Sequence, residues 1–116
     1  AEVAALGADF KGGDLFRVDL ASGRASRSPN AVHGVLDGIA ALPGGGFLVS
    51  DWVAIDKPTP GRLVITDASG APRSDLSLPR PVTGPADFAY DAVSGSVWLP
   101  ALPEGAVLIL PVSPSP

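Results

Sequence analysis

The chain repeats a pattern of short apolar segments every 44 to 50 residues, and this period restricts its fold more than any other feature. Residues 13–19, Gly-Asp-Leu-Phe-Arg-Val-Asp, match residues 61–67 at an offset of 48, and residues 105–109 repeat the start of that pattern 44 positions later. A period of this length is typical of β-propellers, whose blades are four-stranded antiparallel sheets of roughly 40–50 residues. The repeat therefore predicts consecutive blades of a propeller.

The segments between these matches also recur. Residues 36–40 align with 86–90, and residues 47–49 align with 97–99, both at an offset of 50. The apolar runs are short and bounded by Gly, Pro, Asp or Ser, and none keeps a helical stripe over three turns. Ten of the twelve acidic residues are Asp, which favours turns over helices. Both observations indicate an all-β protein.

The expected strands form one complete blade between two partial ones. The complete blade spans residues 36–78, with a blade remnant at 1–28 and a partial blade at 85–111. The strands are expected at 2–6, 13–20, 23–28, 37–42, 46–53, 61–67, 72–77, 86–90, 96–102 and 105–111. Closed propellers have roughly four to eight blades, so about two and a half blades would need the remaining blades of the propeller or further copies of the chain as partners.

The C-terminus is rich in proline. Pro111, Pro114 and Pro116 have no N–H to donate, so strand pairing is expected to stop near Leu110. We expect residues 112–116 to form a flexible tail.

Composition excludes several classes of function. A net charge of −4, a pI near 4.6 and the absence of a Lys or Arg cluster argue against binding to nucleic acid or to an anionic membrane surface. No apolar run approaches the roughly 18 residues of a membrane span. The chain has no Cys, which excludes disulfides and thiolate metal sites. The absence of Met and Cys favours a periplasmic or secreted origin.

Three motifs together resemble a known family. They are Leu-Asp-Gly-Ile-Ala at 36–40, Gly-Phe-Leu-Val-Ser-Asp-Trp at 46–52 and Gly-Arg-Leu-Val-Ile-Thr-Asp at 61–67. This order resembles the senescence marker protein, gluconolactonase and luciferin-regenerating enzyme family of six-bladed β-propellers. Residues 84–91, with 97–100, look like the next blade of its bacterial members. The resemblance covers about residues 13–111 and implies the C-terminal blades of such a propeller.

The resemblance also implies a metal site. Active members of the family hold a divalent cation, usually calcium, in the central channel, and the Asp of the Asp-Gly motif is one of its ligands. Asp37 matches that ligand, and Asp87 is the same position one blade later, where it is expected to bind ligand. The family's other ligands, a Glu and several Asn residues, are not identifiable in this chain. The alternative is that each Asp caps its own loop through backbone N–H groups.

His33 and Trp52 each have a functional and a structural interpretation, and Trp98 has a structural one only. His33, the only His, is expected near Asp37, where it could be a general base or ligand contact, or a solvated loop residue. Trp52, next to Asp51 at a strand end, could stack on a sugar or pack between blades. Trp98 lies inside a strand and is expected in the core.

Three functions remain open from the sequence. The leading hypothesis is a ligand-binding or scaffold domain whose site is the channel mouth lined by Asp37 and Asp87. An alternative is a calcium-dependent lactone or ester hydrolase, completed by upstream sequence or another chain, in which the cation polarises a carbonyl and activates water. Its catalytic residues are unknown. The third is a structural module that self-assembles through unpaired blade faces.

Overall fold

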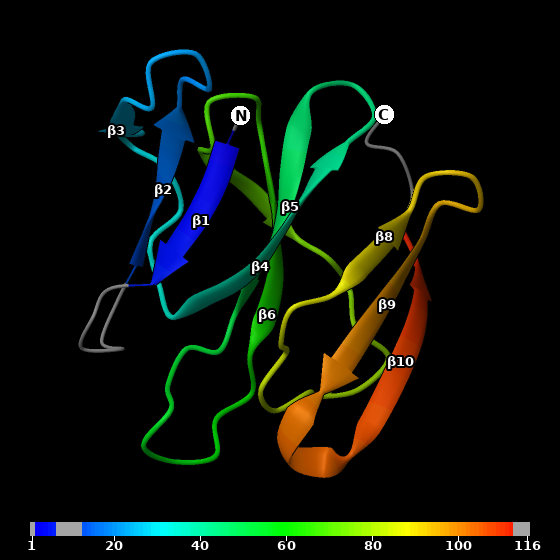
Figure 1. Ribbon diagram of the computed structural model, residues 1–116. Helices are drawn as coiled ribbons and strands as arrows, with labels where there is room; N and C mark the ends of the chain where they lie inside the picture. Colours follow the sequence, from blue (N-terminus) through cyan, green and yellow to red (C-terminus); the bar gives the residue numbers. More distant parts are fainter. Residues whose placement is uncertain (1, 7–12, 113–116) are drawn as a thin grey trace.

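The computed structural model describes residues 2–6 and 13–112. These residues form ten strands in three antiparallel sheets, which lie side by side in the order of the sequence (Figure 1). No α-helix occurs among them, and nothing helical in this part of the chain is long and apolar enough to cross a membrane. The structure confirms the all-β prediction. It contains no closed ring of sheets within the described residues, so the propeller stays a prediction.

The first sheet is drawn in blue in Figure 1 and has the strand order β1-β2-β3. Its strands are β1 (Glu2–Leu6), β2 (Gly13–Val18) and β3 (Ala25–Arg27). The register places Phe16 directly opposite Arg27. β2 and β3 are shorter than expected because the turn between them is wider.

The middle sheet has four strands in the order β4-β5-β6-β7. They are β4 (Leu36–Leu42), β5 (Gly46–Asp51), β6 (Arg62–Thr66) and β7 (Pro72–Asp75). Each strand pairs with its neighbour in sequence, as the repeat predicts for residues 36–78.

The third sheet runs from yellow to red in Figure 1 and has the order β8-β9-β10. It consists of β8 (Ala89–Asp91), β9 (Ser96–Ala101) and β10 (Ala106–Pro111), with a 3₁₀-helix, η1 (Leu102–Glu104), between β9 and β10. Residues 86–88, expected at the start of β8, lie outside the strand.

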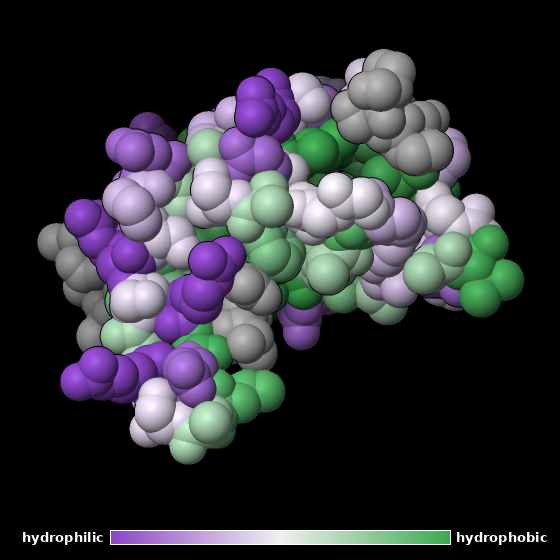
Figure 2. Space-filling model, turned by 90° about the horizontal axis from the view of Figure 1, so that it is seen from above, coloured by the Kyte–Doolittle hydropathy of each residue, from purple (hydrophilic) through white to green (hydrophobic). Residues whose placement is uncertain are grey.

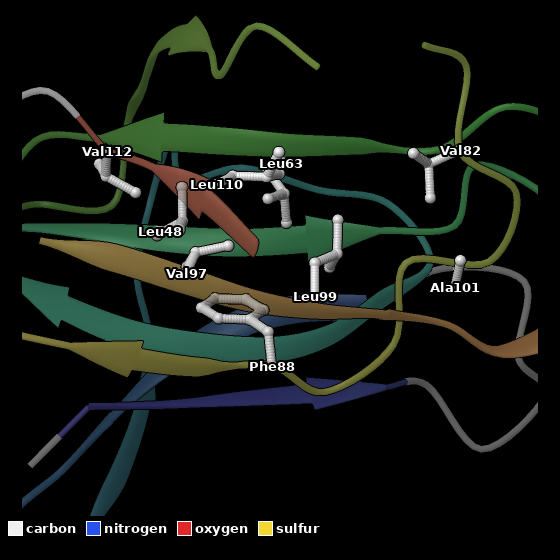
Figure 3. Close-up of a cluster of buried hydrophobic side chains, with 9 residues drawn as sticks. All are labelled: Leu48, Leu63, Val82, Phe88, Val97, Leu99, Ala101, Leu110 and Val112. Carbon is white, nitrogen blue, oxygen red and sulfur yellow. The ribbon is translucent and has the colours of Figure 1, made fainter. Parts of the chain in front are cut away.

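Two apolar clusters join the three sheets. Figure 3 shows the larger one, between the middle and third sheets, made of Leu48, Leu63, Val82, Phe88, Val97, Leu99, Ala101, Leu110 and Val112. The smaller one joins the first and middle sheets through Leu15, Val32, Leu36, Val49 and Val64. Because successive side chains in a strand point to opposite faces, the pairs Leu48–Val49 and Leu63–Val64 supply both clusters. All four side chains have no exposed surface.

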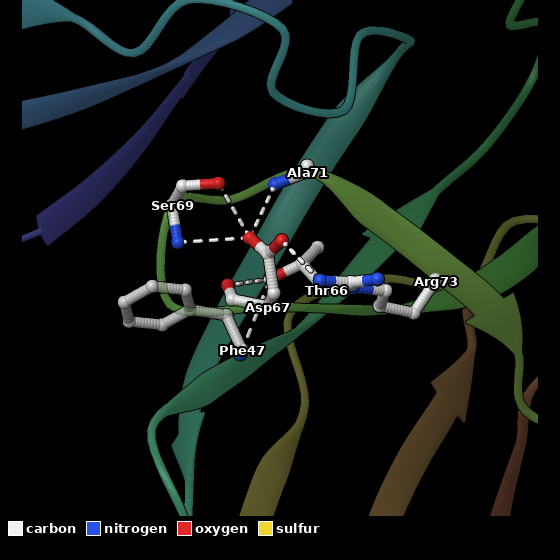
Figure 4. Close-up of polar contacts among 6 residues, drawn as sticks. All are labelled: Phe47, Thr66, Asp67, Ser69, Ala71 and Arg73. Carbon is white, nitrogen blue, oxygen red and sulfur yellow. Dashed lines mark hydrogen bonds and ion pairs between the residues drawn. The ribbon is translucent and has the colours of Figure 1, made fainter.

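Three hairpin turns share one local design, an Asp followed by a Ser and then a Gly with positive φ. Figure 4 shows the example at Asp67. Its Oδ1 accepts hydrogen bonds from the N–H of Ser69 at 2.8 Å, the hydroxyl of Ser69 at 2.5 Å and the N–H of Ala71 at 3.1 Å. Its Oδ2 lies 3.0 Å from Nη2 of Arg73. The Ser69 hydroxyl is the largest cause of a lowered pKa at Asp67.

Asp19 and Asp91 make the equivalent contacts in the β2–β3 and β8–β9 turns. Asp19 accepts hydrogen bonds from the N–H groups of Ala21 and Ser22, and Asp91 accepts from the N–H of Val93 and the hydroxyl of Ser94. These bonds stabilise the charged carboxylate, so the pKa values of Asp19 and Asp91 are also lowered.

Two expectations differ from the structure. Trp98, expected in the core, is 49% exposed, because it lies on the face of β9 opposite Val97 and Leu99 and no described segment covers that face. Val112, expected in the tail, is buried, and its N–H donates to the carbonyl of Gly95 at 2.8 Å. Strand β10 therefore extends to Pro111, and its end is held by the residue that follows. The rest of the expected tail, 113–116, lies outside the described residues.

The turn aspartates predict a specific loss of stability in acid. Their folded pKa values are lowered from 3.8. The stabilisation is therefore complete above a pH of about 4 and is lost as the pH falls through the lowered values. We expect the triple variant Asp19→Asn, Asp67→Asn, Asp91→Asn to be less stable than the wild type at neutral pH, and this difference to shrink as the pH falls. Urea denaturation at a series of pH values measures it.

The control is Asp56→Asn, at an exposed loop residue that holds no hairpin turn. Its unfolding free energy should follow that of the wild type at every pH. A triple-variant difference that is constant with pH would contradict the role given to these turns.

Candidate functional site

The connections between strands gather at one end of the three sheets, which we call the loop end. It comprises the β3–β4, β5–β6 and β7–β8 connections and η1, and Figure 1 shows the β5–β6 connection and η1 at the bottom. The opposite, turn end carries the hairpins β2–β3, β4–β5, β6–β7 and β8–β9. The candidate site residues named from the sequence, Asp37, Asp87, His33 and Trp52, all lie at or beside the loop end.

Asp37 and Trp52 are in direct contact. Asp37 is the second residue of β4 and Trp52 follows β5, and both are half-buried. The indole Nε1 of Trp52 donates to Oδ2 of Asp37 at 3.1 Å. The bond orients the carboxylate of Asp37, and its Oδ1 accepts no hydrogen bond from the described residues.

Trp52 also reaches the third sheet. A Cβ on Gly84 would lie 3.1 Å from Cζ3 of Trp52 and 2.6 Å from Cδ of Pro103, so the indole, Gly84 and the η1 proline pack tightly. Gly84 has a φ of +64°, a conformation that suits glycine. This geometry agrees with the interpretation in which the indole of Trp52 packs between neighbouring sheets. The N–H group of the indole holds Asp37.

Asp87 approaches the same place from the third sheet. It is exposed and lies in the bend before β8. A Cβ on Gly38 would lie 2.9 Å from Oδ1 of Asp87, so the carboxylate contacts the residue next to Asp37 because Gly38 has no side chain. The N–H of Gly38 itself donates to Oγ of Ser50 at 2.8 Å. The structure thus brings Asp87 against Gly38, the residue after Asp37, and within the described residues neither carboxylate caps its loop through a backbone N–H.

That capping role belongs to Asp51, whose function the sequence did not reveal. Asp51 is 2% exposed. Its Oδ1 accepts hydrogen bonds from the N–H groups of Val35 and Val53, both at 2.9 Å, and its Oδ2 accepts from Nε of Arg62 at 2.9 Å. A Cβ on Gly34 would lie 2.5 Å from Oδ2, so Gly34 closes the remaining side. Asp51 therefore fixes the loop before β4, the start of β6 and the residue after Trp52.

Val53 has a φ of +68°, which is a strained conformation for a β-branched residue. The hydrogen bond from its N–H to Asp51 holds it there. Val53 and Ile55 are 47% and 51% exposed, so the β5–β6 loop presents apolar side chains at the loop end. Strained backbone residues cluster at functional sites in proteins, and Val53 is such a residue directly after Trp52.

The β7–β8 connection is tied to η1 by one acidic side chain. Oε1 of Glu104 lies 2.7 Å from Nη1 of Arg80, and Oε2 accepts the N–H of Thr83 at 3.2 Å. These contacts fix the loop that leads to Gly84 and Asp87.

His33 lies apart from the two carboxylates. Its Nδ1 is 2.9 Å from Oδ1 of Asp14, and the same oxygen is 3.7 Å from Nη1 of Arg27. The His33 side chain is 65% exposed. His33 thus contacts the first sheet, and no contact with Asp37 or Asp87 is present among the described residues.

A cavity of about 760 Å³ lies at the other end of the molecule, between the hairpin turns of the middle and third sheets. Leu42, Ile65, Arg73 and Tyr90 are among its lining residues. Figure 2 looks down on this turn end, where apolar surface shows between hydrophilic residues. The guanidinium of Arg73 lies 3.0 Å from the carboxylate of Asp67, so these two charges of the lining pair with each other.

The loop end presents the carboxylate of Asp37, bound to the indole of Trp52, and that of Asp87 against Gly38. Carboxylate oxygens are ligands for hard cations such as Ca²⁺, which takes six to eight oxygens. Two carboxylates are an incomplete set, and residues 13–112 contain no group of three or more His, Cys, Asp or Glu side chains placed to hold a metal. A cation bound here would keep several water ligands or take oxygens from a further molecule.

Comparisons with protein-family models, with curated proteins and with solved structures each found no match to this chain.

The buried carboxylate of Asp51 makes a clear mutational prediction. Asp51→Ala leaves two N–H groups and the Nε of Arg62 without their acceptor, so we expect the free energy of unfolding to fall by about 3 kcal/mol. Urea denaturation followed by circular dichroism measures the change. Asp56→Ala, in the exposed loop nearby, should change it by less than about 0.5 kcal/mol. Equal effects of the two substitutions would contradict the role of Asp51.

The strain at Val53 predicts a stabilising substitution. Val53→Gly removes the Cβ that makes positive φ costly, and we expect it to raise the unfolding free energy by about 1 kcal/mol after the entropy cost of glycine. Val93→Gly is the matched control, because Val93 is 98% exposed and has no positive φ. The control should be neutral or destabilising in the same thermal and urea measurements. A loss of stability in Val53→Gly would show that Val53 is unstrained.

Proposed function

We propose that the chain is part of a gluconolactonase-like β-propeller and acts as a binding domain whose loop end holds a divalent cation, calcium being the natural candidate, through Asp37 and Asp87. The succession of antiparallel sheets, each with strands in sequence order, supports the propeller. So does the place of Asp37, on β4, which is the first strand of the middle sheet and one of its two edge strands. In a propeller that strand lines the central channel.

The observations that carry the proposal are the hydrogen bond from Trp52 to Asp37 and the contact of Asp87 with Gly38, the next residue. The indole N–H fixes one oxygen of Asp37 and leaves the other available. Asp87 comes from the neighbouring sheet against Gly38. A cation at the loop end would be attracted by both negative charges and could take an oxygen ligand from each sheet. His33, bound to Asp14, is not part of this site.

The rigid surroundings also support binding. Asp51 fixes the backbone around Trp52, and Gly84 and Pro103 hold the indole. Site rigidity and the number of charged ligands set the affinity for calcium. With two carboxylates, we expect a dissociation constant on the order of 10⁻³ M for the isolated chain. The lactone hydrolase and its cation-activated water rest on the family resemblance alone, so our proposal is limited to binding.

Terbium luminescence tests the site, because Tb³⁺ replaces Ca²⁺ and is excited by a nearby tryptophan. In a Trp98→Phe background, Trp52 is the only tryptophan. We expect Tb³⁺ emission on excitation of Trp52, and competition by Ca²⁺. Asp37→Asn and Asp87→Asn should each reduce the emission at least tenfold at a fixed Tb³⁺ concentration.

Asp56→Asn is the matched control, since it removes the same charge from the same end of the molecule. It should leave the emission within about twofold, in keeping with the weak effect of exposed charges. Emission that falls equally in all three variants would indicate general attraction to an acidic chain. Emission unchanged in Asp37→Asn would refute the proposed site.

A further inference from the structure

The third sheet has one apolar face that nothing in the described residues covers. Trp98, Val107 and Ile109 are 49%, 61% and 57% exposed. They lie on the same face, because Trp98 pairs directly with Ile109 in the β9–β10 register and Val107 is two residues from Ile109. We call this set of three residues the open face.

The repeat shows what such a face does elsewhere in this chain. Trp98 is in the repeat position of Leu48, at an offset of 50, and Val107 and Ile109 are in the positions of Leu63 and Ile65, at an offset of 44. In the middle sheet Leu48 and Leu63 are fully buried against the third sheet, and Ile65 packs beside them. The same positions therefore form a sheet-to-sheet contact in the middle of the chain and an exposed surface at its end.

The first sheet carries the other half of such a contact. Phe16 is in the repeat position of Val64, at an offset of 48. Val64 packs on the first sheet, whereas Phe16 lies on the face of β2 opposite Leu15, which is turned away from the middle sheet. Phe16 is half-buried, and Arg27 lies directly opposite it on β3. We call the face with Phe16 and Arg27 the outer face.

The two end sheets differ in charge. Residues 2–6 and 13–30 contain three Arg, two Asp and one Glu, whereas residues 79–112 contain one Arg, two Asp and one Glu. Asp91 lies on the open face itself, because it pairs with Ser96 two residues from Trp98. Arg27 on the outer face, which lies 3.7 Å from Asp14, would be attracted to such a surface, and the attraction weakens with salt.

From these positions we infer that the open face docks the outer face of a second copy of the chain, in a head-to-tail arrangement. This contact repeats the packing that already joins the middle sheet to its neighbours. It uses two different surfaces, so it is a heterologous contact, which forms a ring where the geometry closes and a longer assembly where it does not. The inference is independent of the cation site.

Sedimentation velocity over a range of protein concentrations tests the association. We expect the wild type to form dimers or larger species as the concentration rises. Val107→Glu should weaken self-association at least tenfold, because it places a carboxylate in the apolar contact. Val93→Glu is the control, since it adds the same charge at an exposed valine outside both faces, and it should associate as the wild type does. A wild type that stays monomeric at every concentration, or equal losses in both variants, would overturn the inference.

Mixing two blocked variants tests the head-to-tail geometry. Phe16→Glu blocks the outer face and Val107→Glu blocks the open face, so each alone should be monomeric while the mixture forms a dimer that grows no further. Circular dichroism checks the fold of both, and Arg27→Glu, at an exposed side chain, replaces Phe16→Glu if that variant unfolds. Self-association of the Phe16→Glu protein alone, with no further assembly when the Val107→Glu protein is added, would indicate contact between two open faces and refute the arrangement.

Discussion

The burial of both faces of the middle sheet is the constraint on which the rest of the structure depends. Leu48 and Leu63 face one neighbouring sheet, and Val49 and Val64 face the other, all without exposed surface. The first and third sheets each bury one face against the middle sheet, so the middle sheet sets the position of both end sheets. Uninterrupted apolar pairs in β5 and β6 are what allow two-sided burial, whereas alternating strands would leave one face to solvent.

The candidate site depends on that packing through a few polar contacts. Asp51 is the last residue of β5. Its carboxylate accepts hydrogen bonds from the N–H groups of Val35 and Val53, so it fixes the backbone of two loop-end segments relative to that strand. Trp52 then spans the boundary between two sheets, holding Asp37 on one side and packing against Gly84 on the other. The proposed cation would bind across the same boundary. Binding and the packing of the sheets are therefore linked, because a shift of one sheet would separate the two carboxylates.

Most of the fold could be predicted from the sequence, because a repeat and tight turns are local signals. The strands of the middle sheet and their order follow from the motifs at 36–40, 46–52 and 61–67. The exposure of Trp98 could not be predicted, since periodicity assigns a residue to a face but does not say what covers it. The role of Asp51 was also missed, because its partner Val35 is 16 residues away and becomes a neighbour only when β4 and β5 pair. For Asp37 and Asp87, the equivalent repeat positions predicted that both lie at one end of the sheets, but not the hydrogen bond from Trp52 to Asp37.

The turn end and the loop end differ in the sequence separation of the residues that their hydrogen bonds join. At the turn end, Asp67 bonds to residues two and four positions later, so each hairpin contains its own stabilising bonds. At the loop end, the bonds of Asp51 with Val35 and Arg62, and of Trp52 with Asp37, join residues 11 to 16 positions apart and form only when strands β4, β5 and β6 pair. Local contacts form first in folding, on the microsecond scale of isolated hairpins, and longer loops close later. A chain interrupted during folding would therefore have its hairpins formed and its two carboxylates still apart.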